Sequence, residues 1–373
     1  MIRVLHCISD TNIGGAGRML LHLLRHFDRD SFTVAAVVPS GSALAPRIRE
    51  AGAEAIEIDA GHDRSHERGG VAAYRRVIRD WQPDIVHTHA SLDARIAARL
   101  CGVPSRIYTR HSVFDPPRRL TTFPGKQIAG GVNSLLATRI LAVAEAAADN
   151  LRATGVPPEK ITVILNGVEP LALPSPAERT ARRAALGYRE DDFVCGISAR
   201  LEPYKGHSYL LETARKVLRQ APRTRFLLLG NGSCRAELEA AAADLGDAVR
   251  FTGFVSDVEA YYAAMDLSLN CSWGTEATSL ALLEGMSLGL PAVVTDFGGN
   301  PGVITDGENG LLVPTRDAAA MAAAILRLEN DPVLYARLSD GARRIFHEKF
   351  TAAAMTRQIE NVYREEMRRV ARA

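Results

Sequence analysis

Short apolar runs alternate with longer amphipathic stretches along most of the chain. Runs rich in β-branched residues and bounded by Gly, Pro, Asn or Asp are typical of strands, and an apolar period near 3.6 is typical of helices. In the first half, these patterns predict helices at residues 17–27, 70–81 and 92–100. The strands predicted around them cover residues 3–9, 33–38, 55–58, 85–89, 106–109, 140–144 and 161–165. Strands that alternate with helices predict a doubly wound α/β domain with a parallel sheet.

The same rhythm restarts after a proline-rich segment. Residues 169–176 include Pro170, Pro174 and Pro176, which predicts an interdomain linker. Further strands are predicted at residues 193–198, 225–229, 249–252, 266–270, 292–295 and 311–313, and a last helical stretch covers residues 352–373. We therefore expect two Rossmann-like domains, at residues 1–168 and 177–351.

Two glutamates eight residues apart stand out in the second predicted domain. Glu284 shares a predicted helix face with Leu280 and Leu288, so its carboxylate should be buried and should need a hydrogen-bond donor. Glu276 precedes this helix, in a loop rich in Gly, Ser and Thr. Loops at the carboxyl ends of parallel strands bind ligands in open α/β sheets. The alternative is that Glu276 merely decorates the first turn of the helix and that Glu284 is paired inside the fold.

An anion is favoured beside these glutamates, because free backbone amides occur at a helix N-terminus. The amides concerned here are those of Thr278, Ser279 and Leu280. Arg200 and Lys205 follow the predicted strand at 193–198, so both cations can converge on one anion. The alternative for this Arg and Lys is two solvated surface charges.

The region from residue 270 to residue 314 resembles the signature region of the family 4 glycosyltransferases. The resemblance rests on the E-x7-E spacing of Glu276 and Glu284, and on three short motifs that follow in the same order. These motifs are Gly289-Leu-Pro291, Asp296-x-Gly-Gly299 and Gly310-Leu-Leu-Val-Pro314. Two positions depart from the family pattern: Gly302 stands where a glutamate is usual, and Ala199 stands where a glycine is usual before Arg200.

The resemblance implies a retaining enzyme of the GT-B fold that uses a nucleotide-sugar donor. It implies two Rossmann-like domains facing across a cleft and a C-terminal helix that crosses back to the first domain. It also implies a role for each matching residue: Arg200 and Lys205 on the donor diphosphate, Glu276 on a sugar hydroxyl, Glu284 on the ribose, Gly14 and Gly15 beside the donor phosphates and sugar, His89 on the transferred sugar, and Gly230, Phe254 and Val255 at the nucleobase.

Composition narrows the class of protein. The chain has 373 residues and a formal net charge of +2. This charge is not the strong positive excess that is typical of nucleic-acid-binding proteins. Its five cysteines are scattered, which favours free thiols in a reducing compartment. No secretion signal pattern opens the chain, and no uncharged apolar run reaches the roughly 20 residues of a membrane span. We therefore expect a cytosolic protein.

Transfer without a metal or other cofactor is expected, because two protein cations can stabilise the departing diphosphate. A D-x-D metal site is not expected, while His87 and His89, on one face of a strand, leave a metal site as an alternative. Three other functions are kept open: a nucleotide-sugar epimerase on a GT-B-like fold, an NAD oxidoreductase and an inactive binding module. The loop at Gly15 and Gly17 argues against the oxidoreductase, since it lacks the third glycine of a dinucleotide fingerprint.

The acceptor is suggested by a basic and apolar stretch in the first domain. Between residues 106 and 126 there are five cations and one acid, Asp115, with Phe114, Leu120 and Phe123 among them. The cations are Arg106, Arg110, Arg118, Arg119 and Lys126. We read this stretch as a proline-containing loop that suits an anionic membrane surface or a lipid-diphosphate acceptor. The alternative is a solvated loop whose aromatic side chains pack inward.

Overall fold

The computed structural model describes residues 1–255 and 257–372, which form two compact units. Unit 1 comprises Met1–Gly167 together with the C-terminal segment from Ala352, and unit 2 comprises Val168–Thr351. The proline-rich segment 169–176 therefore lies within unit 2. Among the described residues, no helix is both long and apolar enough to cross a bilayer.

Unit 1 is built on a parallel sheet of seven strands in the order β3-β2-β1-β4-β5-β6-β7. Its strands are β1 (Ile2–Ile8), β2 (Phe32–Pro39), β3 (Glu54–Ile58), β4 (Ile85–His89), β5 (Ser105–Arg110), β6 (Arg139–Ala142) and β7 (Ile161–Val163). Its helices are α1 (Gly15–His26), α2 (Leu44–Glu50), α3 (Gly70–Trp81), α4 (Leu92–Leu100), α5 (Arg118–Thr121), α6 (Gly125–Leu136), α7 (Glu145–Ala153) and α16 (Ala352–Ala371), with a 3-10 turn at Pro158–Lys160.

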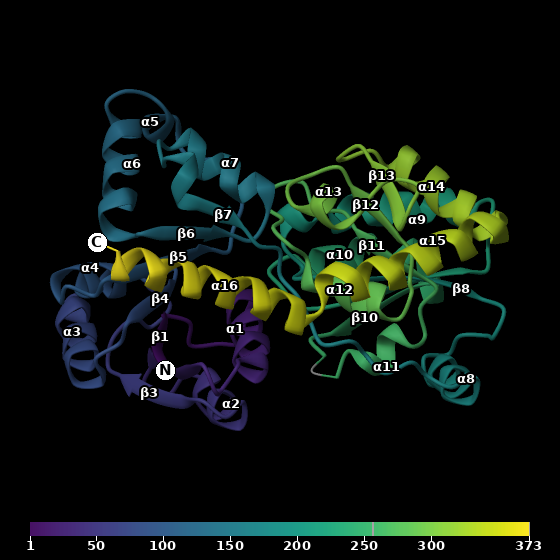
Figure 1. Cartoon of the computed structure of the whole chain (residues 1–373). Coiled ribbons are helices and arrows are strands. Elements are labelled where there is room, and N and C mark those ends of the chain that lie inside the picture. The colour runs from purple at the N-terminus through teal and green to yellow at the C-terminus, as the bar shows by residue number, and fades with distance from the viewer. Residues whose placement is uncertain (256, 373) are drawn as a thin grey trace. The chain divides into compact units, whose positions relative to one another are not determined.

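Helices cover both faces of this sheet (Figure 1). Val4 and Ile8 of β1 pack in a core cluster with residues of α1, α2 and α16, whereas Leu5 and Cys7 pack in a second cluster with residues of α3 and α4. Burial on both faces explains why the strands read as nearly continuous apolar runs. The last helix, α16, thus completes the core of unit 1.

Unit 2 repeats the architecture with six parallel strands in the order β10-β9-β8-β11-β12-β13. Its strands are β8 (Phe193–Ser198), β9 (Thr224–Leu229), β10 (Val249–Gly253), β11 (Leu267–Asn270), β12 (Ala292–Thr295) and β13 (Gly310–Val313). Its helices are α8 (Pro176–Ala185), α9 (His207–Leu218), α10 (Arg235–Ala241), α11 (Glu259–Tyr262), α12 (Leu280–Ser287), α13 (Asn300–Val303), α14 (Ala318–Asn330) and α15 (Pro332–Ile345), with 3-10 segments at Pro203–Lys205 and Ala243–Ala248 and a π segment at Phe346–Phe350.

The strand orders locate the expected ligand sites. In a doubly wound sheet, ligands bind outside the carboxyl ends of the strands where the direction of winding reverses. That switch point lies between β1 and β4 in unit 1 and between β8 and β11 in unit 2. The loops that follow these four strands are therefore the expected ligand-binding loops.

Two local expectations are corrected. The stretch read as a loop near residues 118–126 contains α5 and the start of α6. The predicted strand at 140–144 ends at Ala142, since Ala144 is already the N-cap of α7. Both differences occur where element boundaries depend on caps and packing rather than on apolar pattern.

Candidate active site

The switch point of unit 2 brings Lys205 and Glu276 together. Lys205 Nζ lies 2.8 Å from Glu276 Oε2, and both side chains are nearly buried, with 14% and 9% exposure. The same carboxylate oxygen accepts hydrogen bonds from Asn270 Nδ2 at 3.0 Å and from Ser272 Oγ at 2.7 Å. The cation is therefore held in one place by a carboxylate that is itself fixed by two neutral donors.

Close approach of two loops creates this pair. Gly206, just after Lys205, has φ +75, and a Cβ there would lie 2.1 Å from the Cys271 carbonyl oxygen, so only glycine fits. Trp273 fastens the same loops, because its backbone N–H donates to the Tyr204 carbonyl at 3.0 Å and its indole N–H donates to the Pro203 carbonyl at 3.0 Å. The loops after β8 and β11 thus act as one rigid edge.

Arg200 is placed differently from Lys205. It is exposed, and its guanidinium lies over the Tyr204 ring at 5.9 Å from the centroid. The contact of Lys205 is Glu276, so the expected convergence of both cations on one anion stays a prediction. Their shared loop at the end of β8 is consistent with it.

Helix α12 begins one residue after its cap, Ser279, whose hydroxyl accepts from the Leu282 N–H at 3.4 Å. The first-turn amides, beginning with Leu280, have no acceptor within a helix. Thr278 and Ser279, which the sequence also suggested as amide donors, lie just before the helix. Glu284 is 3% exposed, as its position between Leu280 and Leu288 predicted.

Gly298 and Gly299, the glycine pair of the signature, pack against the backbone carbonyl of Glu276. The Gly299 N–H donates to the Glu276 carbonyl at 3.0 Å. Gly298 has φ +59, and a Cβ there would lie 2.4 Å from the same carbonyl oxygen. Gly302, which replaces the usual glutamate, is exposed in α13 and adds no side chain to this cluster.

The residues expected at a nucleobase lie at the ends of β9 and β10. Gly230 donates its N–H to the Gly253 carbonyl at 2.9 Å, so the two loops adjoin. Gly230 has φ +140, and a Cβ there would lie 2.0 Å from the Ala199 carbonyl oxygen. Phe254 is 81% exposed and Val255 is half-buried. Close backbone packing thus accounts for Gly230, while the exposed Phe254 ring is available to a ligand.

In unit 1, the loop after β1 leads into α1 with Gly14 as the N-cap. A Cβ at Gly15 would meet nothing within 4 Å, and one at Gly14 would meet only the Asp10 carboxylate at 3.9 Å. Gly17 differs, because its Cβ would clash with Leu44 at 2.8 Å. Gly14 and Gly15 therefore keep an open surface at a helix N-terminus, and Gly17 serves packing.

Sequence reasoning missed Asp10, which lies two residues after β1 and beside Gly14. Burial and the neighbouring Asp63 raise the pKa of Asp10 to about 6. Asp63 keeps a lowered pKa, because the hydroxyl and the backbone N–H of Thr11 donate to it. An aspartate directly after a strand at the switch point was the available signal.

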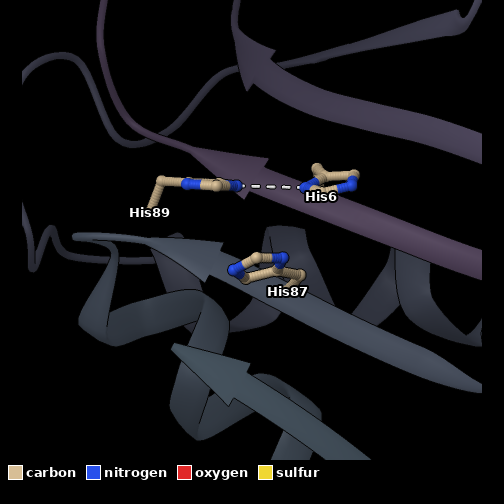
Figure 2. A group of neighbouring side chains, drawn as sticks. All are labelled: His6, His87 and His89. Atoms are coloured by element: carbon tan, nitrogen blue, oxygen red, sulfur yellow. Dashed lines mark hydrogen bonds between the residues drawn. The ribbon is translucent and has the colours of Figure 1, made fainter. Parts of the chain in front are cut away.

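Histidines of β1, β4 and the loop after β5 form a hydrogen-bonded chain, of which Figure 2 shows His6 and His89 with the neighbouring His87. His6 Nδ1 lies 3.0 Å from His89 Nε2, and His89 Nδ1 lies 2.9 Å from His111 Nε2. His87 lies beside them, with its two ring nitrogens bonded to Tyr363 Oη at 2.5 Å and Thr109 Oγ1 at 2.6 Å. Tyr363 comes from α16, so the last helix fixes a ring next to the candidate site.

Burial keeps these four rings neutral. It lowers the pKa of His6 to about 3 and that of His111 to about 4, and it holds the pKa of His87 and His89 well below the ordinary value. His6 Nε2 is buried and lacks a hydrogen-bond partner among the described residues. A buried N–H without an acceptor is the rarer and costlier orphan, so we infer that His6 Nε2 carries no proton. The N–H bonds then point outward, from His6 to His89 and from His89 to His111.

This arrangement bears on the role expected for His89. The ring is fully buried, and both of its nitrogens are occupied by His6 and His111. His111, which is half-buried, is the member of the chain that reaches the edge. A ligand at this edge would meet His111, with His89 behind it.

Among the described residues, His6, His87 and His89 form the group whose geometry could suit a metal ion, with nitrogens within 4.8 Å of one another. The sequence suggested two of these three residues. The rings are neutral and fully buried, both nitrogens of His87 are already bonded, and the group contains no anionic ligand to offset an ion's charge. We interpret these three residues as hydrogen-bonded side chains rather than as metal ligands.

The chain also contains an Asp-x-Asp sequence, at Asp28-Arg29-Asp30. It lies between α1 and β2, at the amino ends of the strands and away from the switch point. Asp28 accepts from the backbone N–H groups of Asp30 and Ser31 and lies 3.2 Å from Arg364 of α16. Its role is therefore to fasten the last helix.

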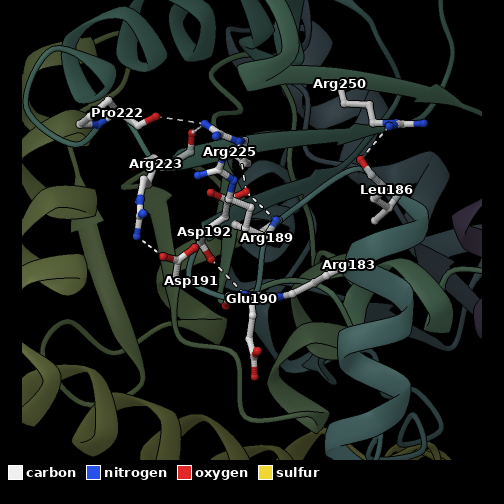
Figure 3. A network of polar contacts seen from close by, with 12 residues as sticks. Arg183, Leu186, Arg189, Glu190, Asp191, Asp192, Pro222, Arg223, Arg225 and Arg250 are labelled. Carbon is white, nitrogen blue, oxygen red and sulfur yellow. Dashed lines mark hydrogen bonds and ion pairs between the residues drawn. The ribbon is translucent and has the colours of Figure 1, made fainter.

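A polar network occupies the corresponding amino-terminal edge of unit 2 (Figure 3). Arg183 donates to the carbonyls of Glu190 at 2.7 Å and Asp192 at 3.0 Å, and Arg225 Nε lies 3.4 Å from Asp192 Oδ2. Arg183, Glu190 and Asp192 precede β8, and Arg225 lies near the start of β9. Lys205 and Glu276, by contrast, follow the carboxyl ends of β8 and β11. The network therefore stabilises the sheet from the end opposite the candidate site.

A solved structure shares this fold over nearly the whole chain. The crystal structure of Anabaena HepE in complex with UDP superposes with a TM-score of 0.83 at 21% sequence identity, covering 98% of this chain and 100% of that one. Together with the two parallel sheets, this similarity defines the fold as GT-B, the class of glycosyltransferases built from two Rossmann-like domains.

Comparison of sequences gives the family. The model described as Glycosyltransferase Family 4 matches residues 13–170, and the model described as Glycosyl transferases group 1 matches residues 192–331. EpsD of Bacillus subtilis (strain 168) is 30% identical over 309 residues, which cover 79% of this chain and 80% of that protein. The Escherichia coli UDP-Gal:alpha-D-GlcNAc-diphosphoundecaprenol alpha-1,3-galactosyltransferase is 28% identical over 75% of each chain. The chain belongs to the family 4 glycosyltransferases.

Proposed function

We propose that this enzyme moves a hexose from a UDP-sugar to a glycan carried on a lipid diphosphate, with retention of the anomeric configuration. The observation that carries the proposal is the buried Lys205–Glu276 pair at the switch point of unit 2, beside the N-terminus of α12. Similar proteins supply the substrate classes, since HepE was crystallised with UDP and the Escherichia coli relative is named for a diphosphoundecaprenol acceptor. We do not propose an epimerase, an NAD oxidoreductase or an inactive binding module for this chain.

Each residue of the unit 2 site has a proposed task. Glycosyl transfer passes through an oxocarbenium-like state while negative charge builds on the leaving diphosphate. Lys205, Arg200 and the amides at Leu280 would stabilise that charge, because fixed cations and helix N–H groups are preorganised donors. Glu276 would accept from a hydroxyl of the sugar, and Glu284 would hold the ribose.

Unit 1 would supply the remaining contacts. Gly14 and Gly15 leave an open helix N-terminus, and His111 would present the N–H at the outer end of the histidine chain. The retained configuration would arise by displacement on one face of the sugar. We propose that no metal ion is required, since the leaving group is met by protein cations.

We also propose that the reaction takes place in the cytoplasm, at the inner leaflet where a lipid-linked acceptor is accessible. All five cysteines are free thiols, which suits a reducing compartment.

Glu284→Gln is expected to weaken UDP binding about 10-fold to 100-fold, because a hydrogen bond to a charged group contributes roughly 1.5–3 kcal/mol. Isothermal titration calorimetry with UDP measures this change. Glu237→Gln, at an exposed position of α10 in the same unit, is the matched control and should bind UDP like the wild type. Equal affinity of the wild type and Glu284→Gln for UDP would show that Glu284 does not hold the nucleotide.

A further inference from the structure

Large exposed apolar side chains gather in one segment of unit 1. Five of them lie between residues 114 and 135, whereas Met1, Ile13 and Leu100 are separate from one another along the rest of that unit. The five are Phe114 (52% exposed), Phe123 (82%), Ile128 (62%), Val132 (45%) and Leu135 (57%). Exposed apolar residues that gather on one surface mark an interaction site more often than scattered ones do.

Helix α6 presents three of these residues as a stripe. Ile128, Val132 and Leu135 are spaced i, i+4 and i+7, so they share one face of the helix. The inner face is firmly seated, because Gly130 is buried and a Cβ there would lie 2.1 Å from the Gly155 carbonyl oxygen. The apolar stripe therefore belongs to a helix that is already packed on its other side.

Cations accompany the stripe. Arg118 and Arg119 are exposed on α5, and Lys126 is in the first turn of α6; the two helices lie together in Figure 1. Within the part of the chain that the structure describes, no carboxylate forms an ion pair with any of these three cations. The segment from 114 to 135 contains one acid, Asp115. The positive charge of Arg118, Arg119 and Lys126 is therefore available to an anionic surface.

We propose that α5 and α6 form a face that binds an anionic lipid bilayer. The apolar stripe and Phe123 would enter the boundary between headgroups and acyl chains, and the three cations would lie among lipid phosphates. This combination of uncompensated positive charge and linear apolar surface favours a membrane over a protein partner. The inference rests on the proposed function for its purpose, since a lipid-linked acceptor lies at a membrane surface.

Co-sedimentation with vesicles of phosphatidylcholine and phosphatidylglycerol tests this face. Arg118→Glu with Arg119→Glu should weaken binding by about 30-fold or more, equivalent to about 2 kcal/mol, and added salt should weaken wild-type binding. Ile128→Glu with Val132→Glu should also release the protein, because it removes the apolar contact. Val333→Glu, at a position 80% exposed in unit 2, is the matched control and should bind like the wild type.

The proposal is overturned if the wild type does not bind these vesicles, or if both double variants bind like the wild type. It is also overturned if the wild type is a dimer that Ile128→Glu with Val132→Glu converts to a monomer without affecting vesicle binding, because the stripe would then join two copies. Thermal unfolding of each variant checks that the fold is intact. The vesicles contain no sugar acceptor, so failure here is separate from failure of the transferase assay.

Discussion

Lys205→Ala is expected to lower kcat/KM for sugar transfer by about 10² or more, because it removes a preorganised cation from the leaving diphosphate. The cation is held by its 2.8 Å contact with Glu276, so its position is set before charge develops on the diphosphate. Steady-state kinetics with the donor varied at saturating acceptor measures the loss. The effect should appear mainly in kcat, since the charge on the diphosphate grows as the bond breaks.

Two variants separate chemistry from damage to the site. Lys216→Ala removes a more exposed lysine of α9, paired with Glu212 one turn away, and should retain wild-type kinetics. Lys205→Arg keeps the positive charge and should recover part of the loss in kcat. A kcat/KM for Lys205→Ala within threefold of the wild type would remove Lys205 from the mechanism.

Lowering the pH from 6 to 5 is expected to destabilise unit 1 more than unit 2. His6, His87, His89 and His111 have lowered pKa values in the folded state, so the unfolded chain binds protons that the folded unit does not. The stability that these neutral histidines contribute is fully present above the ordinary histidine pKa and is lost as the pH falls below it. Within that pH window, each such histidine lowers the free energy of unfolding of unit 1 by about 1.4 kcal/mol per pH unit.

Asp10 acts in the opposite direction. Its pKa is raised to about 6, so the folded unit gains a proton between about pH 6 and pH 4 and offsets roughly one histidine. After this offset, the free energy of unfolding of unit 1 should fall by up to about 4 kcal/mol per pH unit. In unit 2, the pKa of His207 is lowered to about 4 by burial and by Lys205, and that of Glu329 is raised by burial, so these two groups oppose each other.

Hydrogen exchange followed by mass spectrometry resolves the two units, because peptides from each report their own opening free energy. Core peptides of β1 and β4 should lose protection between pH 6 and pH 5, after correction for the intrinsic exchange rate, while those of β8 and β11 should change little. An equal change in both units would mean that the histidine chain is not what makes unit 1 sensitive to acid.

The sequence alone predicted the strands of both sheets, because most of them are short apolar runs; central strands such as β1 and β4 are buried on both faces. Phe193–Ser198 and Ala292–Thr295 were placed with their observed ends. Helix α6 was not foreseen as a helix, since Gly130 and Gly131 weaken the helical pattern and the helix depends on packing against Gly155.

The candidate site of unit 2 could be read from sequence because its residues lie in short motifs with fixed spacing. The contact of Lys205 with Glu276 spans 71 residues and depends on Gly206 meeting Cys271, which no local pattern encodes. The link from His6 to His89 spans 83 residues and arises because β1 and β4 are neighbours in the sheet. Strand order, rather than composition, decides such contacts.

The central claim is that this chain transfers a sugar from UDP with retention and without a metal. The most direct test mixes the enzyme with a UDP-α-hexose labelled with carbon-13 at the anomeric carbon and a polyprenyl-diphosphate-linked sugar, in excess EDTA, and follows the anomeric carbon by NMR. We predict an α-linked product that forms at an undiminished rate. A β-linked product, or loss of transfer that Mn²⁺ restores, would contradict the account.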